Sequence, residues 1–462
     1  MSSASAGHRP RTPRRAAPSA GAPLRAIESV PILLLLAVAL LFGGSAAPLA
    51  DLVVEFVAVI VLAIMAVRFD AAAWRATRPG WILALATIAL ALIQLVPLPF
   101  ALWSALPGRA PAAELMALAG LGQPAHPLSL DPNATLSALL SFLAGLAAFI
   151  AALAAGPRLR RLLVGAILAG ALVSALLGVL QISGNTQFYL YEHSDFDWVT
   201  GLFANHNHAA DLFLIGIAIA GARLAEADGA GSGRGLIYCG LILVLGTATI
   251  LTGSRVGMVL LGIELLAGAL LLGRRFGRAI LIGALACTVA AGVAGWAILA
   301  SPVATRAADR FETLTEDMRP EIWRSTNAAV ATYLPVGSGL GTFIAVYPRH
   351  EQPDQLQRLV INHAHNDYLE LLLELGLLAP ALFLAYLVLL GMAVRRLLAA
   401  GIDAASVGVL AAILVLLVHS AVEFPLRNDS LLVVFGLLNG ILVAAARDAG
   451  GARAGTRRGG TA

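Results

Sequence analysis

The chain has 462 residues, of which 59% are hydrophobic and 13% are charged, and its mean hydropathy is +0.84. These values exclude a soluble globular protein and indicate a polytopic membrane protein. The formal net charge of +4 is too small, and its arginines too scattered, to indicate a nucleic-acid partner.

Twelve apolar segments of about 18–22 residues are long enough to cross a bilayer as helices, which predicts an all-α integral membrane fold. They lie near residues 30–47, 50–67, 81–98, 136–155, 162–182, 208–225, 235–252, 256–273, 279–300, 367–391, 403–422 and 429–446. Spans one to nine thus occupy residues 30–300, and spans ten to twelve occupy residues 367–446. One long hydrophilic loop, residues 301–366, separates the two groups. The tails, 1–29 and 447–462, are rich in Arg, Gly, Ala and Pro and are predicted to be disordered and cytoplasmic.

The arginines predict the orientation, because positive charge accumulates on the cytoplasmic side of membrane proteins. With the N-terminus inside, 22 of the 31 cationic residues fall on the cytoplasmic side. The other nine break this bias, and six of them lie in the 301–366 loop. They are Arg109, Arg255, Arg306, Arg310, Arg319, Arg324, Arg349, Arg358 and Arg427. Since an outer loop needs no positive charge for orientation, an anionic ligand is the candidate explanation. Individually, five of the nine arginines can instead be solvated loop charges: Arg306, Arg310, Arg324, Arg349 and Arg358.

The remaining composition argues against a metal or disulfide site. Cys239 and Cys287 both lie inside apolar runs. The first apolar run follows a long basic tail without a convincing cleavage site, so we expect no cleavable signal peptide.

Four polar segments fall on the predicted outer face, which suggests that they form one site. They are Gly-Leu-Phe-Ala-Asn-His-Asn-His at 201–208, Thr-Gly-Ser-Arg-Val-Gly at 252–257, Arg-Pro-Glu-Ile-Trp at 319–323 with the glycine-rich 337–343, and His-Asn-Asp-Tyr at 365–368. In the last of these segments, nine residues separate Asn366 from Gly376. Gly337, Gly339 and Gly341 are interpreted as turn residues, because no Walker-type Lys-Ser/Thr follows them.

This set of motifs resembles the bacterial O-antigen ligase and polysaccharide polymerase superfamily over about residues 125–445. Members share an outward Gly-x-Phe-x-Asn-x-Asn segment, a Ser-Arg-x-Gly turn, an Arg-x-x-x-Trp with a glycine-rich stretch, and His-Asn followed nine residues later by Gly. The resemblance implies a membrane glycosyltransferase of the bacterial inner membrane with a periplasmic active site. It implies transfer from an undecaprenyl-diphosphate-linked glycan to an acceptor hydroxyl, without metal, cofactor or nucleotide sugar. It also implies that Arg255, Arg319 and His365 are essential.

The chemistry of these side chains agrees with the resemblance. Guanidinium groups can neutralise a diphosphate leaving group without a metal, which suits Arg255 and Arg319. Histidine, with an ordinary pKa of about 6.5, suits a general base toward the acceptor hydroxyl, and we assign that role to His365.

Several candidates also have a structural interpretation. Asn205 and Asn207 can bind glycan or cap span six, and Asn366 can orient the imidazole or bind a sugar. Arg255 can be an interfacial anchor. Glu264 and Glu374 are functional candidates because carboxylates at membrane depth are costly, but either can instead neutralise an arginine across the bundle. Asp367 and Glu370 suit the N-terminal end of span ten.

The acceptor separates the main alternatives. A ligase attaches the chain to a lipid A core sugar, whereas a polymerase joins lipid-linked repeat units or builds an exopolysaccharide. The His-Asn-nine-Gly spacing favours the ligase. A secondary transporter would show paired halves and polar residues near the membrane midplane. A C-type lipid-linked glycosyltransferase would carry an acidic pair in the first outer loop, where this chain has Asp51 alone.

Overall fold

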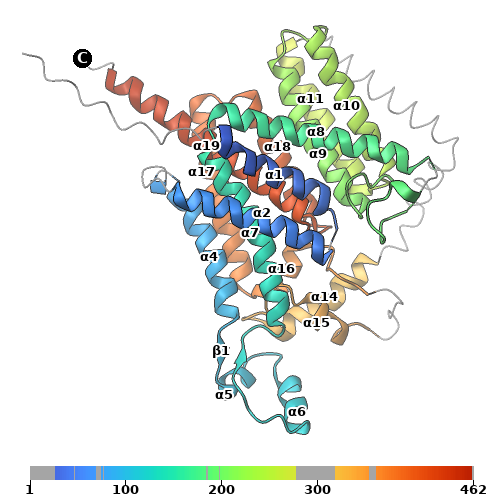
Figure 1. Cartoon of the computed structure of the whole chain (residues 1–462), viewed down its shortest axis with the longest axis vertical. Coiled ribbons are helices and arrows are strands. Elements are labelled where there is room, and N and C mark those ends of the chain that lie inside the picture. The colour runs from blue at the N-terminus through green and yellow to red at the C-terminus, as the bar shows by residue number, and fades with distance from the viewer. Residues whose placement is uncertain are drawn as a thin grey trace, which may run out of the picture.

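The computed structural model describes residues 26–45, 47–68, 74–75, 77–183, 186–196, 198–276, 318–352 and 360–459. Over these residues the protein is a bundle of long helices with one two-stranded sheet, which confirms the all-α polytopic fold (Figure 1). Eight helices are long and apolar enough to cross a membrane, and three shorter apolar helices accompany them in the described part of the chain. The predicted span 279–300 lies outside the described residues, so the count of twelve stays a prediction.

The helices that coincide with predicted spans are α1 (Ala26–Phe42), α2 (Pro48–Val67), α4 (Arg78–Gln94), α7 (Pro132–Ala154), α8 (Pro157–Gln181), α9 (His206–Glu226), α10 (Gly233–Leu251), α11 (Arg255–Phe276), α17 (Leu378–Ala400), α18 (Ala404–His419) and α19 (Asp429–Gly459). The elements between them are β1 (Pro97–Leu98), α5 (Phe100–Ser104), α6 (Ala110–Leu118), β2 (His126–Pro127), η1 (Thr186–Phe188), α14 (Arg319–Tyr333), α15 (Phe343–Val346), η3 (Tyr347–Arg349), α16 (Asp367–Leu375) and η5 (Pro425–Arg427). Because α19 continues to Gly459, residues 447–459 are helical where their composition predicted a disordered tail.

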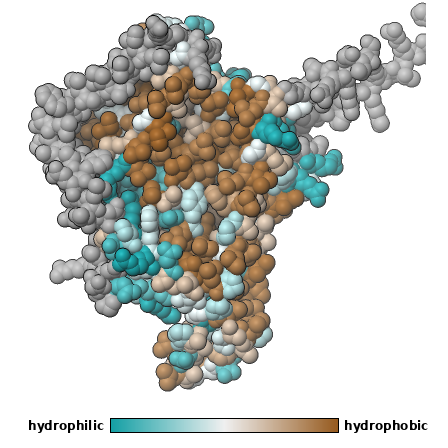
Figure 2. Space-filling model, turned by 180° about the vertical axis from the view of Figure 1, so that it is seen from behind, coloured by the Kyte–Doolittle hydropathy of each residue, from teal (hydrophilic) through white to brown (hydrophobic). Residues whose placement is uncertain are grey.

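Burial divides the helices into an inner and an outer set. The apolar windows of α9 and α19 are 72% and 78% buried, whereas that of α17 is 11% buried. The outer helices expose large apolar side chains such as Phe56 and Leu384. Figure 2 shows hydrophobic residues over much of one face of the bundle. Such a surface suits contact with lipid chains.

The closest helix pairing is between α7 and α19, and small residues make it possible. A Cβ atom on Gly436 would lie 2.1 Å from the carbonyl oxygen of Gly145, and one on Gly440 would lie 2.4 Å from that of Phe149. The two backbones are therefore in direct contact. This is the packing expected where van der Waals contact, rather than the hydrophobic effect, holds helices together.

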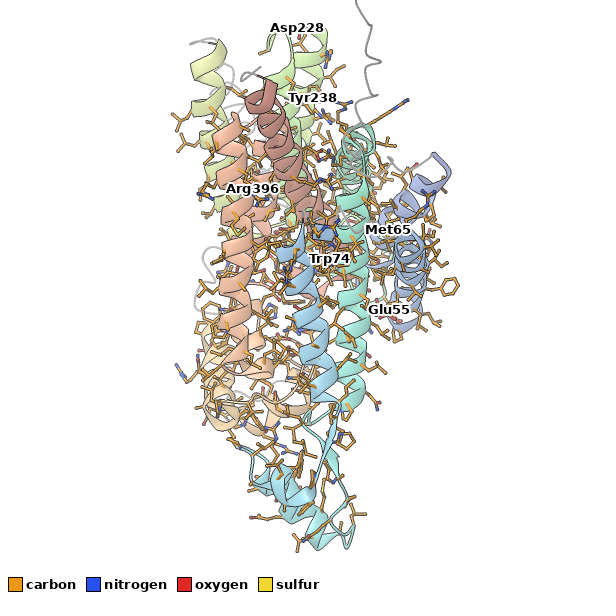
Figure 3. The ribbon with its side chains drawn as sticks, turned by 90° about the vertical axis from the view of Figure 1, so that its left-hand side faces the viewer. Glu55, Met65, Trp74, Asp228, Tyr238 and Arg396 are labelled. Carbon is orange, nitrogen blue, oxygen red and sulfur yellow. The ribbon has the colours of Figure 1, made fainter. Side chains whose placement is uncertain are left out.

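A small cap, residues 97–131 with β1, β2, α5 and α6, extends from one end of the bundle (Figures 1 and 3). Arg109 joins this cap to the glycine-rich segment: its guanidinium is fully buried and donates to the carbonyls of Leu128 at 2.8 Å and Gly337 at 2.9 Å. Gly337, Gly339 and Gly341 all have positive φ, which confirms that they are turn residues. We call this the cap end of the bundle.

The predicted tenth span, 367–391, is wrong in its first part. The chain forms the short helix α16, breaks at Gly376 and Leu377, and only then enters the spanning helix α17. Gly376 has φ 58° and ψ −140°, a conformation that side chains disfavour. The nearest carbonyl oxygen, that of Pro335, would lie 2.1 Å from a Cβ there. Asp367 and Glu370 thus begin α16 rather than a transmembrane helix.

Replacing Gly376 with alanine should destabilise the protein. The backbone conformation alone costs a residue with a side chain about 1–3 kcal/mol, and the methyl group would also strike Pro335. We expect a lower midpoint of thermal unfolding for the detergent-purified Gly376→Ala protein. Gly391→Ala is the matched control, because Gly391 lies within α17 in open space, and it should be neutral or slightly stabilising. Equal midpoints for the two variants would contradict the prediction.

Candidate active site

A buried carboxylate, that of Glu423, lies at the centre of the polar residues at the cap end. Its side chain has an exposed fraction of 0%. It forms an ion pair with Arg319, accepts a hydrogen bond from the Asn207 Nδ2 at 3.0 Å, and faces the His365 Nδ1 at 3.3 Å from both oxygens. Three of the four predicted motifs therefore meet on one residue that none of them contains.

The backbone presents His365 to this carboxylate through an uncommon conformation. Among the residues that the structure describes, His365 is the non-glycine residue with a positive φ, 47°. Asn366 follows in an extended conformation and caps α16, its Oδ1 accepting from the Leu369 amide at 3.0 Å. Left-handed geometry outside glycine costs free energy and is concentrated at functional sites. The imidazole is 27% exposed, so a ligand can reach it.

Phe424, next to Glu423, packs against three imidazoles. The ring of His365 lies edge-on to it at 4.9 Å between centroids, His208 does the same at 5.0 Å, and His363 is tilted at 4.4 Å. The His363 Nδ1 also lies 2.9 Å from the Glu370 Oε1. The three histidines therefore share one aromatic neighbour at this site.

The electrostatics keep Glu423 ionised. Burial by itself would raise the pKa of this carboxyl, but the hydrogen bond and charge of His365, together with the charge of Arg319, outweigh burial and hold the pKa well below its ordinary value. A permanently negative group beside an imidazole orients its ring and stabilises the imidazolium, as the aspartate of a catalytic triad does.

A second buried cluster lies beside the first and surrounds Arg427. Its guanidinium binds the Glu374 Oε2 at 2.7 Å, and it lies 3.5 Å from the Glu370 Oε1 and 3.6 Å from the Asp367 Oδ1. Glu374 also accepts from the Gly341 amide at 2.8 Å. One face of α16 is thereby fixed to η5 and to the glycine-rich turn.

Three carboxylates around one guanidinium do not all ionise with equal ease. Burial raises the pKa of Asp367 to about 7, although Arg427 and Ser420 oppose the shift. Burial would also raise the pKa of Glu370, but Arg427 and His363 outweigh it and the pKa falls below its ordinary value. Burial also raises the pKa of Glu374 above its ordinary value, so Asp367 and Glu374 hold a proton at higher pH than exposed carboxyls do, whereas Glu370 releases its proton more readily.

The remaining predicted residues have structural partners. Asn205 caps α9, its Oδ1 accepting from the Asn207 amide at 2.7 Å, as one of its two interpretations required. Glu374 is fully buried and pairs with Arg427, the structural alternative foreseen for it. Arg255 begins α11 and is half-buried, and its turn packs against α9, with a Cβ on Gly257 lying 2.9 Å from that of Ala210.

The structure gives several of the nine outer arginines a role other than binding an anionic ligand. Arg109 and Arg427 are buried and bind protein groups instead. Arg306, Arg310 and Arg358 lie outside the described residues. Arg319 and Arg255 remain the candidates for an anionic substrate.

Sequence motifs missed Glu423, Arg427, His363 and Phe424. The signal for them was available in part, because Val422-Glu423-Phe424-Pro425-Leu426-Arg427 places two opposite charges in the short connection between two apolar segments. Arg427 was noted only as an exception to the charge bias.

The fold and the site define a polytopic membrane protein with an ionisable centre at one end of its helix bundle. A family model described as O-antigen ligase (Wzy_C) matches residues 240–384. Over these residues, less than half of the chain, the protein is similar to the O-antigen ligase-related superfamily. No curated protein matches the chain. The matched residues include Arg255, Arg319 and His365, whereas Glu423 and Asn207 lie outside them.

The raised pKa of Asp367 gives stability a defined pH dependence. The folded protein holds a proton on this carboxyl up to about pH 7, whereas an unfolded aspartate releases it near pH 4. The free energy of unfolding should therefore fall as the pH rises from about 4 to about 7, by at most about 4 kcal/mol. Asp367→Asn should flatten this slope in thermal unfolding measured from pH 5 to 8. Asp228→Asn, at an exposed position, should retain it, and an unchanged slope in the Asp367 variant would refute the assignment.

Proposed function

We propose that the protein is a glycosyltransferase that moves a glycan from undecaprenyl diphosphate to an acceptor hydroxyl on the periplasmic face of the inner membrane. The observation that carries the proposal is the convergence of His365, Arg319 and Asn207 on the buried Glu423. O-antigen ligase, with a lipid A core sugar as acceptor, is the activity we favour, because the family match and the His-Asn-nine-Gly spacing both support it.

His365 is assigned as the general base. Its Nδ1 faces Glu423, so its Nε2 is the atom that can approach the acceptor hydroxyl. The acceptor oxygen attacks the anomeric carbon of the donor sugar as the bond from that carbon to the diphosphate oxygen breaks. The hydroxyl proton passes to Nε2, and Glu423 stabilises the imidazolium that results. Diphosphate leaves as an anion bound to the lipid.

Arg319 is assigned to the leaving group. Its guanidinium shares the Glu423 carboxylate with His365, so a diphosphate bound by Arg319 lies beside the imidazole. An arginine can neutralise charge that develops on the departing oxygens in a partly dry site. Arg255, the first residue of α11, is assigned to the same diphosphate.

Complementation of a strain that lacks this gene tests the reaction and the residues together. We expect wild type to restore long chains on lipid A, and His365→Asn, Arg319→Lys and Arg255→Lys to leave lipid-linked polymer accumulated. Asparagine tolerates the left-handed backbone at position 365, and lysine keeps charge but loses the bidentate geometry of arginine. Surface glycans resolved on a gel give the readout.

The controls are His193→Asn and Arg349→Lys, both at exposed positions outside the Glu423 centre, and both should complement fully. A shift to single repeat units would instead identify a polymerase, and loss of free polymer with intact lipopolysaccharide would identify an exopolysaccharide enzyme. Unchanged glycans in the His365→Asn strain, with the variant present in the membrane, would refute the proposal.

Glu423→Gln separates positioning from binding. The amide keeps the size of the side chain but loses the charge that orients and stabilises His365, so we expect the turnover rate to fall by about 10²-fold or more. The KM for the acceptor should change little, because Glu423 is buried. Purified enzyme with a lipid-linked glycan donor gives both constants. An unchanged turnover rate would remove Glu423 from the mechanism.

A further inference from the structure

One cavity in the described part of the protein lies far from the Glu423 centre. It has a volume of about 770 Å³ and opens between α8, α9, α17, α18 and α19. Its walls include Glu226, at the last turn of α9, while Asn207, at the first turn, binds Glu423. The length of α9 therefore separates the cavity from the site, on the order of 30 Å at 1.5 Å per residue. In Figure 3 Asp228, two residues beyond α9, lies at the end away from the cap.

The cavity has a charged rim and an apolar interior. The rim carries three cations and three anions: Arg160, Arg161, Arg223, Glu226, Asp403 and Asp448. Apolar side chains such as Ile219, Val409 and Leu442 line it deeper in the bundle. A gradient from charge at the helix ends to hydrocarbon within the bundle matches an amphipathic molecule that is already in the membrane.

The rim charges are only partly neutralised by one another. Arg160 pairs with Asp448, which also binds Arg447 at 3.0 Å, and Arg223 binds Glu226 at 3.0 Å. Arg161 and Asp403 are the remaining cation and anion. Arg160 is 8% exposed, and its Nε has no hydrogen-bond partner among the described residues. A buried donor without a partner costs about 1–3 kcal/mol unless a ligand supplies an acceptor.

We propose that this cavity binds one phospholipid with an amine-bearing, zwitterionic headgroup. The phosphate lies at Arg160 and Arg161, the ammonium group lies at Asp403, and the acyl chains follow the apolar wall. Asp403 binds no arginine among the described residues and accepts only from the Ser406 amide, so the rim offers a carboxylate for a cationic group beside the guanidinium groups that suit a phosphate. The volume is ample for a headgroup and the first part of its chains, since ligand sites commonly enclose about 300–1,000 Å³.

Native mass spectrometry of the full chain, released from detergent, tests the site directly. Phosphatidylethanolamine, phosphatidylglycerol and phosphatidylcholine with identical acyl chains are added in turn. We expect one phosphatidylethanolamine to be retained in preference to the other two. Preferential retention of phosphatidylglycerol, equal retention of all three, or no retained lipid would each overturn the proposal.

Two charge variants locate the binding to this rim. Arg161→Gln and Asp403→Asn should each lower the bound fraction about threefold to tenfold, as expected for loss of one partly exposed charge contact. Asparagine can replace the Asp403 cap on the Ser406 amide, so α18 should keep its first turn. Arg396→Gln is the control, because Arg396 is exposed on α17 outside the cavity (Figure 3). Unchanged binding in both rim variants would refute the site, whatever the fate of the glycosyltransferase activity.

Discussion

Removing a carboxylate from water costs several kcal/mol of free energy unless cations and hydrogen-bond donors replace its hydration. The arrangement of the cap end follows from the protein groups that replace the hydration of Glu423. Its partners are Asn207 on α9, Arg319 on α14 and His365 in the segment before α16. Asn207 and His365 are more than a hundred residues apart in the sequence. Removing one of these partners would leave the negative charge of Glu423 incompletely compensated. The interactions that keep Glu423 ionised therefore also hold together the helices that carry its partners. The position of His365 therefore depends on the same interactions that stabilise the packing of these helices.

The connection between α18 and α19 supplies both buried centres, since Glu423 and Arg427 are four residues apart. It also fixes the start of α16 through its backbone: the Asp367 amide donates to the Ser420 carbonyl at 2.9 Å, and the Leu426 amide donates to the Asp367 Oδ2 at 3.2 Å. His365 lies two residues before this contact. His365 can keep its left-handed backbone conformation because hydrogen bonds fix the backbone that follows it.

Hydropathy predicted the bundle well, because apolar length reports directly on membrane-spanning helices, while the orientation that the charge bias predicts stays a prediction. The same signal failed at Gly376, where Leu371-Leu372-Leu373-Glu374-Leu375-Gly376-Leu377-Leu378 reads as one apolar run, although tertiary contact with Pro335 breaks it. Motif spacing identified His365 and Arg319, but it carries no information on which buried carboxylate they share. Pairing between residues 207, 319, 365 and 423 is a property of three-dimensional packing. One sequence cannot specify it when each residue also has a plausible local role, as Asn205 does in capping α9.

The glycine contacts between α7 and α19 have a consequence for genetics. Gly436 and Gly440 touch backbone atoms of the neighbouring helix, so any side chain there must push apart two of the most central elements of the bundle. Under the proposed function, random mutagenesis scored by loss of surface glycan would therefore recover these positions, within the membrane, alongside those at the Glu423 centre. A map of inactive variants would show two groups of residues, and only protein abundance measured in parallel would distinguish failure to assemble from failure to react.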